Sequence, residues 1–263
     1  MLSRLTRLQA VTVCALPVVA LIATALFAPL PFSVAQPGST ADVLGTFKGK
    51  EVITVSGRPV RHTSGQLRMV TIMATGPEAR VSLGDVVDGW FATDRAVMPR
   101  DAVYGGGDVR QIEQHNAEQM KQSQDAATRA AQKYLGMSDR DLKVKLQLAD
   151  VGGPSAGLLF TLGIIDKVRG AGGGADLTGG RTIAGTGTID ADGTVGAVGG
   201  VSLKTQAARR DGATVFLVPR AECGEAGSEL PKGLRLVPVT DLKGTVNALT
   251  ALREGKDSSV PSC

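Results

Sequence analysis

The distribution of apolar positions sets the start of the 263-residue chain apart from the rest. Between Arg7 and Asp42 there is no charged residue. Val11 to Phe32 is almost continuously apolar and long enough to cross a hydrocarbon core of about 30 Å. Because Arg4 and Arg7 precede this stretch, the positive-inside rule leaves the start in the cytoplasm and places the remainder outside. We therefore expect residues 1–35 to form a single-pass anchor in the cell membrane.

A removed signal peptide is the alternative interpretation of the same segment. Ser33-Val34-Ala35 resembles a small-residue cleavage site, and cleavage there would give a secreted protein. The anchor is favoured because the apolar stretch exceeds the usual signal core of about 7 to 15 residues. In both cases the bulk of the chain is expected to be extracytoplasmic.

Residues 36–142 alternate between strand-like and helix-like patterns. Glu51 to Val55 and Leu67 to Thr75 are rich in Val, Ile and Thr, which predicts two strands in a hairpin-like arrangement. Leu83 to Phe91 predicts a short helix, and Asp94 to Tyr104 shows no regular pattern. This region is expected to be a small strand-plus-long-helix region.

The long helix is predicted over Asp108 to Leu135. Its first residue and Gln111 resemble a capping box, and Gly136 suits the position after the C-terminus. Its apolar stripe is narrow, so it fits core packing, which we favour, or a partner helix. The stripe consists of Ile112, Met120, Ala127, Ala131 and Tyr134.

Residues 143–253 alternate strands and helices, followed by an expected flexible tail over 254–263. Lys143 to Ala149 predicts a half-buried strand, Ala156 to Val168 an apolar helix, and Asp190 to Gly193 the turn of a hairpin. The hairpin arms are Arg181 to Ile189 and Thr194 to Val198, and the later elements are a helix over Val201 to Arg210, strands over Thr214 to Val218 and Leu234 to Val237, and a helix over Leu242 to Leu252. The alternation indicates a mixed-sheet α+β fold.

Composition and charge exclude several classes of function. The net charge is +4, but aromatic residues make up 3% and the charges are scattered, so no nucleic-acid partner is expected. There is no CxxC pair, and His62 and His115 have no partner at helical spacing, so neither a metal nor a cofactor is expected. Cys14 is read as a small apolar residue. Outside the cytoplasm, a disulfide between Cys223 and Cys263 is possible.

The candidate chemistry centres on Ser155 in the frame Gly153-Pro154-Ser155-Ala156-Gly157. No histidine follows this serine in the chain, so Lys204 becomes the natural base. A serine nucleophile needs a base within hydrogen-bond reach and donors for the oxyanion, and free N–H groups at a helix start supply such donors. The non-catalytic alternatives are a helix cap for the serine and a solvated surface position for the lysine.

Lysine acts as a base only when it is neutral. At its ordinary pKa about one molecule in 2,500 is neutral at pH 7, and burial lowers the pKa by disfavouring the charged form. Lys204 should therefore be buried, and its neighbours in the sequence include no acid. Thr186 is placed to orient the amine.

Three segments carry a resemblance to the proteolytic domain of the Lon protease family, over about residues 143–252. They are VGGPSAGLLFTLG, TIAGTGTIDADGTVGAVGGVSLK and DGATVFLVPRAEC, in the family's order. The resemblance implies a Ser-Lys dyad peptidase with a mixed α+β fold. Its nucleophile motif falls on Pro154-Ser155-Ala156-Gly157, its base motif on Gly199-Gly200 with Lys204, and the threonine of its Thr-Gly motif on Thr186.

The chain departs from ATP-dependent members of that family. It has no GxxxxGK[ST] phosphate loop, so ATP use is not expected. It is more similar to bacterial membrane-anchored proteins that combine a PDZ and a Lon-type domain, but the few residues between Gly136 and Lys143 leave no room for the PDZ domain.

The expected function is an ATP-independent serine endopeptidase acting on unfolded or membrane-associated proteins. The alternative is a membrane-bound scaffold or binding protein that retains the fold without turnover. By analogy with ring-forming relatives, a homo-oligomer is also expected.

Overall fold

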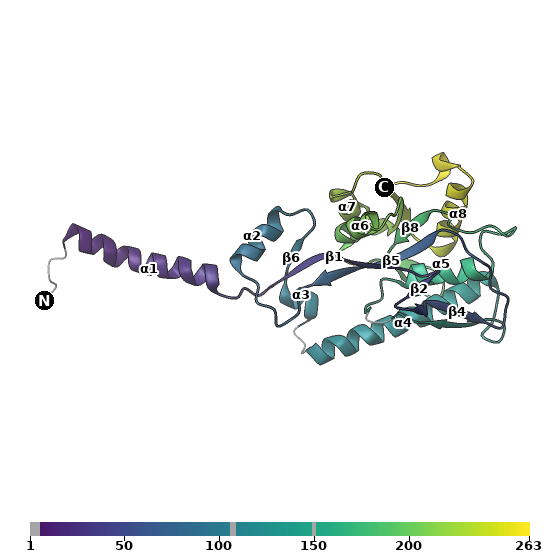
Figure 1. Ribbon diagram of the computed structural model, residues 1–263, viewed down its shortest axis with the longest axis horizontal. Helices are drawn as coiled ribbons and strands as arrows, with labels where there is room; N and C mark the ends of the chain where they lie inside the picture. Colours follow the sequence, from purple (N-terminus) through teal and green to yellow (C-terminus); the bar gives the residue numbers. More distant parts are fainter. Residues whose placement is uncertain (1–5, 106–108, 149–150) are drawn as a thin grey trace. The chain divides into compact units, whose positions relative to one another are not determined.

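The computed structural model describes residues 6–105, 109–148 and 151–263 (Figure 1). The chain forms two compact units. The first contains Met1–Gln36 and Ala74–Gly107, and the second contains Pro37–Met73 and Asp108–Cys263. All the candidate site residues lie in the second unit.

The first unit begins with helix α1 (Arg7–Phe27). The helix ends earlier than the apolar stretch, because Ala28 precedes Pro29 and takes an extended conformation with ψ 137°. The large apolar side chains described on this helix are exposed, from Val11 to Leu26. Within the described residues, we find no helix that combines the length and the apolar character needed to cross a membrane.

The remainder of the first unit pairs segments far apart in the sequence. Strand β6 (Ala96–Pro99) pairs antiparallel with the start of β1 (Phe32–Asp42), and helix α3 (Arg100–Tyr104) follows. These elements replace the expected irregular segment, because the pairing with β1 has no local sequence signature. Helix α2 (Leu83–Phe91) has the predicted bounds.

The second unit is built on the strand order β12-β11-β8-β5-β1. Three pairs in this order are parallel: β5 (Gln66–Ala74) with β8 (Thr182–Gly185), β8 with β11 (Val215–Pro219), and β11 with β12 (Arg235–Val239). Strands β1 and β5 each run from one unit into the other. Parallel neighbours require long crossover connections, which here contain the helices.

Shorter strands stand outside this sheet. Strand β4 (Ile53–Ser56) pairs antiparallel with β7 (Lys143–Leu146), and β2 (Thr46–Phe47) pairs with β3 (Lys50–Glu51). The expected hairpin between the strands near residues 51–55 and 67–75 is therefore wrong, since β4 and β5 belong to different sheets. Ala149, the expected end of β7, lies outside the described residues.

Helices cover both faces of the sheet. Helices α4 (Val109–Leu135), α5 (Gly157–Val168) and α8 (Leu242–Arg253) share one hydrophobic core, and α6 (Val201–Arg210) and α7 (Cys223–Ser228) share another. Figure 1 shows α4 and α5 on one side of the strands and α6 and α7 on the other. Alternate strand residues enter the two cores: Ile183, Leu217 and Val237 the first, and Ala184, Phe216 and Leu236 the second. A mixed α+β fold is confirmed.

Helix α4 packs on the core, as the favoured interpretation predicted. Met120, Ala127 and Ala131 are buried, and Gly136 follows the helix in a left-handed conformation with φ 67°. The helix also contacts α5. The expected capping box begins at Asp108, which lies outside the described residues.

The compact units do not follow the expected ranges 36–142 and 143–253. The second unit includes residues 37–73 because β4 pairs with β7 and β5 with β8. At the other end, residues 254–263 contain a short 3-10 helix η2 (Asp257–Ser259) and bury Val260. The chain end is joined to α7 by a disulfide between Cys263 and Cys223, with 5.5 Å between their Cα atoms.

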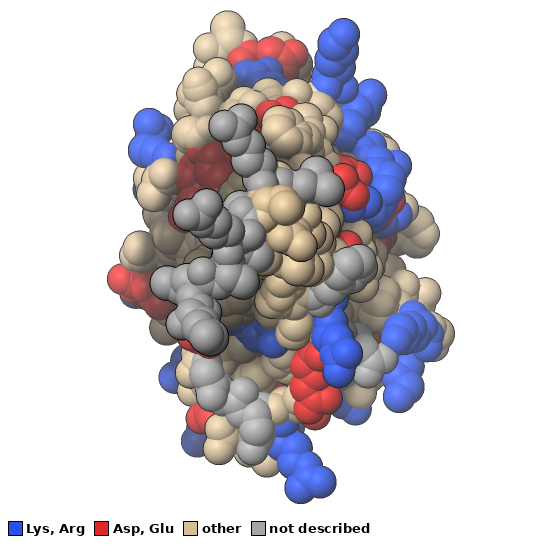
Figure 2. All heavy atoms as spheres, turned by 90° about the vertical axis from the view of Figure 1, so that its left-hand side faces the viewer, with Lys and Arg blue, Asp and Glu red and all other residues tan. Residues whose placement is uncertain are grey.

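Basic and acidic side chains are interspersed on the face shown in Figure 2.

Candidate active site

Ser155 lies in the turn that leads into α5. The helix begins at Gly157 with Ala156 in the N-cap position, and no side chain caps it. The structure therefore does not support reading Ser155 as a helix cap. Ser155 is half-buried, whereas Ala156 and Gly157 behind it are buried.

Helix α4 holds this turn through two hydrogen bonds. The Gly153 N–H donates to the backbone oxygen of Asn116 at 3.2 Å, and Ser123 Oγ donates to the backbone oxygen of Pro154 at 3.0 Å. Gly153 has φ +85°, which favours glycine. Helix α4, which lies upstream in the sequence, therefore fixes the backbone just before Ser155.

Sequence reasoning missed both Asn116 and Ser123. Ser123 is buried and falls on the same face of α4 as Met120 and Ala127. A polar residue at helical spacing within an apolar stripe was the available signal. Asn116 contributes a backbone oxygen, for which its side chain gives no signal.

Gly157 allows three elements to meet beside Ser155. A Cβ atom at this position would lie 2.9 Å from Ser123 Oγ and 2.9 Å from Cγ2 of Ile189. Helices α4 and α5 and the hairpin would then have to separate. The glycine is therefore explained by close packing.

The hairpin reaches the serine through its backbone. The predicted arm from Arg181 to Ile189 is interrupted, so that β8 ends at Gly185 and β9 (Thr188–Ile189) begins after Gly187. At the interruption, the Gly187 N–H donates to the backbone oxygen of Ser155 at 3.0 Å. Thr186 Oγ1 donates to the same oxygen at 3.3 Å. Strand β9 then pairs with β10 (Val195–Gly196), which confirms the hairpin.

Lys204 joins this group from the first turn of α6. Its side chain is buried, with 4% of the residue exposed, and Nζ donates to Thr186 Oγ1 at 3.1 Å. Thr186 is itself fully buried. The threonine hydroxyl therefore connects the lysine amine to the backbone of Ser155, so the structure brings together the three residues singled out in the sequence.

Burial lowers the pKa of Lys204 to about 8, although Glu225 and Glu222 act in the opposite direction. At that pKa about one molecule in ten carries a neutral amine at pH 7. The sequence neighbours of the lysine include no acid, but α7 and the preceding turn η1 (Arg220–Glu222) bring two glutamates near it. These acids are the second feature that sequence reasoning missed.

The start of α5 offers fewer free donors than expected. The Gly157 N–H donates to the backbone oxygen of Pro154 at 3.4 Å, and the Leu158 N–H donates to that of Gly187 at 3.1 Å. These two N–H groups are therefore already occupied, and the expected oxyanion donors stay a prediction. The helix dipole of α5 still favours negative charge at this end.

Over residues 6–105, 109–148 and 151–263, no cluster of three or more His, Cys, Asp or Glu side chains has the arrangement to hold a metal ion.

A comparison with protein families identifies the domain that contains this site. The model described as the Lon protease (S16) C-terminal proteolytic domain matches residues 107–250. The match begins before α4, so this helix belongs to the matched domain, and not only the part from residue 143 onward. No curated protein matches the chain. Since the family model covers more than half of the chain, the protein belongs to the Lon protease (S16) family and carries its serine-type proteolytic domain.

Proposed function

We propose that this protein is an ATP-independent serine endopeptidase in which Ser155 is the nucleophile and Lys204 the general base. One observation carries the proposal. The Lys204 amine is buried and bound to Thr186, whose hydroxyl donates to the backbone oxygen of Ser155. A buried lysine with a lowered pKa beside a serine in a glycine-rich turn has the properties of a base that activates a hydroxyl.

The proposed reaction proceeds in two stages. The neutral amine takes the hydroxyl proton of Ser155 while Oγ attacks the carbonyl carbon of the scissile peptide bond. The resulting ammonium returns the proton to the leaving nitrogen, the C–N bond breaks, and an acyl-enzyme remains. The amine then takes a proton from water while the water oxygen attacks the ester carbonyl carbon. The ester C–Oγ bond breaks, the ammonium returns that proton to Oγ of Ser155, and the second product leaves as a carboxylic acid.

Thr186 has a separate part in this scheme. Its oxygen accepts a hydrogen bond from Lys204 Nζ, and its own hydrogen is directed to the backbone oxygen of Ser155. The hydroxyl hydrogen is thus occupied, and Thr186 orients the amine without receiving the serine proton. Its role is that of a positioning residue.

The proposed setting is outside the cytoplasm, with residues 1–35 as a membrane anchor. The charge-free stretch from Val11 to Phe32 supports the anchor. The disulfide between Cys223 and Cys263 supports an oxidising compartment, where such bonds persist. Unfolded or membrane-associated proteins are the proposed substrates, no metal, ATP or other cofactor is needed, and a homo-oligomer is proposed by analogy.

Hydrolysis of an unfolded protein by the full-length protein in detergent tests the enzymatic proposal. Fluorescein-labelled casein, with and without ATP, is compared for wild type, Ser155→Ala and Lys204→Gln. We expect equal rates with and without ATP, and a loss of about 10³-fold or more in both variants. Equal rates in wild type and both variants would exclude the dyad.

A fluorophosphonate probe separates the enzyme from the non-catalytic scaffold. An activated serine reacts with the probe, so wild type should be labelled and Ser155→Ala should not. A wild-type protein that is folded but unlabelled would favour the scaffold.

A further inference from the structure

We infer that Glu225, held in place by the Cys223–Cys263 disulfide, is a positioning residue for the Lys204 amine. The inference rests on the proposed role of Lys204 as the base. It concerns the segment from η1 through α7, which follows both the serine turn and the hairpin in the sequence.

The first observation is a helix that is capped from another segment. Helix α6 has Gly200 at its N-cap in a left-handed conformation, and no N-cap side chain satisfies its first N–H groups. Glu225 Oε1 accepts from the N–H of Val201 at 2.7 Å and from that of Ser202 at 3.5 Å. A carboxylate at the positive end of a helix is stabilising, so Glu225 replaces the missing cap.

Glu222 binds the backbone just before α6. Its Oε1 accepts from the Val198 N–H at 3.2 Å, just ahead of the two glycines that precede α6. Its Oε2 is buried and has no hydrogen-bond partner in the described part of the chain. Both glutamates therefore direct carboxylates at the backbone that leads into the lysine helix.

The capped turn carries the base. The backbone N–H of Lys204 donates to the oxygen of Gly200 at 3.1 Å, which places the lysine one turn above the N-cap. Its amine meets Thr186 Oγ1 at 3.1 Å. A displacement of this turn by about 1 Å would break that contact and misplace the base, and errors of this size reduce catalysis strongly.

The disulfide fixes the segment that provides the cap. Helix α7 has only six residues and is too short to be stable by itself. Its first residue, Cys223, is bonded to Cys263 at the chain end. That end is fixed in turn, because Arg235 of β12 donates to the backbone oxygen of Asp257 at 2.8 Å and to that of Val260 at 3.2 Å. The disulfide thus connects α7 to the edge strand of the sheet.

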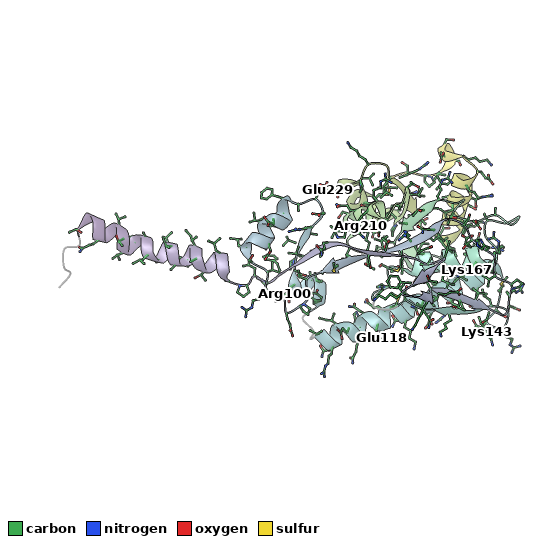
Figure 3. All side chains as sticks on the ribbon, in the orientation of Figure 1. Arg100, Glu118, Lys143, Lys167, Arg210 and Glu229 are labelled. Atoms are coloured by element: carbon green, nitrogen blue, oxygen red, sulfur yellow. A yellow bond between two sulfur atoms is a disulfide. The ribbon has the colours of Figure 1, made fainter. Side chains whose placement is uncertain are left out.

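Because charged groups surround Lys204, the role of Glu225 can be tested by the pH dependence of the reaction rate. Glu225 and Glu222 both raise the pKa of Lys204 against the larger effect of burial. The other basic residues of α6 lie at its opposite end, where Arg209 donates to the backbone oxygen of Lys232. Arg210 pairs there with Asp211 (Figure 3). Arg220 of η1 is exposed. Neutralising Glu225 should therefore lower the pKa of Lys204 further and move the rising limb of the pH–rate profile to lower pH.

The experiment measures the rate constant for fluorophosphonate labelling of the full-length protein from pH 6 to 10. In Glu225→Gln the amide oxygen still accepts the helix N–H groups but the charge is lost, so the midpoint should fall by about half a pH unit with a similar plateau. In Glu225→Ala the cap is lost as well, and the plateau rate should fall about tenfold. Glu229→Gln, just beyond α7, is the matched control and should keep the wild-type profile (Figure 3).

The disulfide is tested by Cys263→Ser, alone and combined with Glu225→Gln. Release of α7 should lower the plateau, and Glu225→Gln should then give no further shift of the midpoint. Should Cys263→Ser fail to fold, the Glu225 variants alone decide. Profiles for Glu225→Gln and Glu225→Ala that coincide with that of Glu229→Gln overturn the inference. Persistent labelling of Ser155→Ala would instead overturn the proposed function.

Discussion

Two buried lysines in the second unit lie in contrasting surroundings. Lys204 and Lys167 are 4% and 7% exposed. Lys167, near the end of α5, donates from Nζ to the backbone oxygen of Ile53 at 2.7 Å and so connects α5 to β4 (Figure 3). Lys204 donates instead to the hydroxyl of Thr186, which is bound to the backbone of Ser155.

Burial by itself therefore does not identify a base. A backbone carbonyl only accepts hydrogen bonds, so the Lys167 amine acts there as a donor that joins two elements. A hydroxyl both donates and accepts, and at Lys204 it holds the amine beside a serine. The first lysine is a structural contact, and the second is the one that we propose for proton transfer.

Replacing each lysine by methionine should give the largest separation between them. We expect Lys204→Met to lower kcat/KM by about 10³-fold without loss of stability, because the base is removed and a buried amine no longer has to be charged at neutral pH. Lys167→Met should retain activity within about threefold but lower the free energy of unfolding by about 1–3 kcal/mol, since the carbonyl of Ile53 loses its donor. Casein hydrolysis and urea unfolding measure the two effects, and the reverse pattern would remove the distinction.

The hydroxyl of Thr186 should account for the next largest effect. Thr186→Val preserves shape but removes the partner of Lys204, and we expect about a tenfold loss of kcat together with a changed pH profile. Thr186→Ser should restore most of the activity. If the valine variant matches wild type in both rate and pH midpoint, the threonine does not position the amine.

A smaller effect is expected where α4 holds the serine turn. Ser123→Ala removes the donor to the Pro154 oxygen and should cost about 1 kcal/mol in unfolding and a few-fold in kcat. Thr128→Ala is the matched control, because that hydroxyl bonds to Gln124 within the same helix. Equal kcat values in the two variants would show that the Ser123 contact serves stability alone.

The smallest expected effect on activity concerns the carboxyl next to Lys167. Burial raises the pKa of Asp166 to about 6, with Asp176 adding to the rise and Arg61 opposing it. Between about pH 4 and pH 6 the folded protein therefore binds more protons at this site than the unfolded chain, so its contribution to stability falls as pH rises.

Asp166→Asn removes this titration. The unfolding free energy of wild type relative to Asp166→Asn should decrease by about 2 kcal/mol between pH 4 and pH 7, as measured by urea denaturation at each pH. The rate of casein hydrolysis should change little, because Asp166, with Asp176 and Arg61, is separate from Ser155 and Lys204. A constant difference across this range would contradict a raised pKa.

Local sequence patterns predicted elements whose signals are themselves local. Helix α6 has the predicted bounds, and the hairpin at Asp190 to Gly193 forms as its Asp-Gly turn indicates. Strands β1 and β6 escaped notice because β6 is defined by its pairing with β1, and β1 by its pairing with β5 and β6. The β4–β7 pairing joins segments about ninety positions apart, for which no turn residues give evidence.

The candidate site shows the same division. Ser155, Thr186 and Lys204 were recognisable from motifs in their own segments, and the structure places them together. The contacts that hold them come from elsewhere: Ser123 from α4, and Glu222 and Glu225 from the α7 segment. Their distance along the chain hid these contacts, although the polar interruption of the α4 stripe at Ser123 gave one clue.

The pH dependence of fluorophosphonate labelling at Ser155 reports directly on whether Lys204 is the base. With Lys204 as the base, the rate constant in the full-length protein should rise with pH to a plateau, with a midpoint near pH 8, because the pKa of Lys204 is lowered to about 8. The same measurement on Lys204→Gln should show labelling reduced about 10²-fold or more across the range. Labelling that is independent of pH between 6 and 10, or unaffected by Lys204→Gln, would contradict the account.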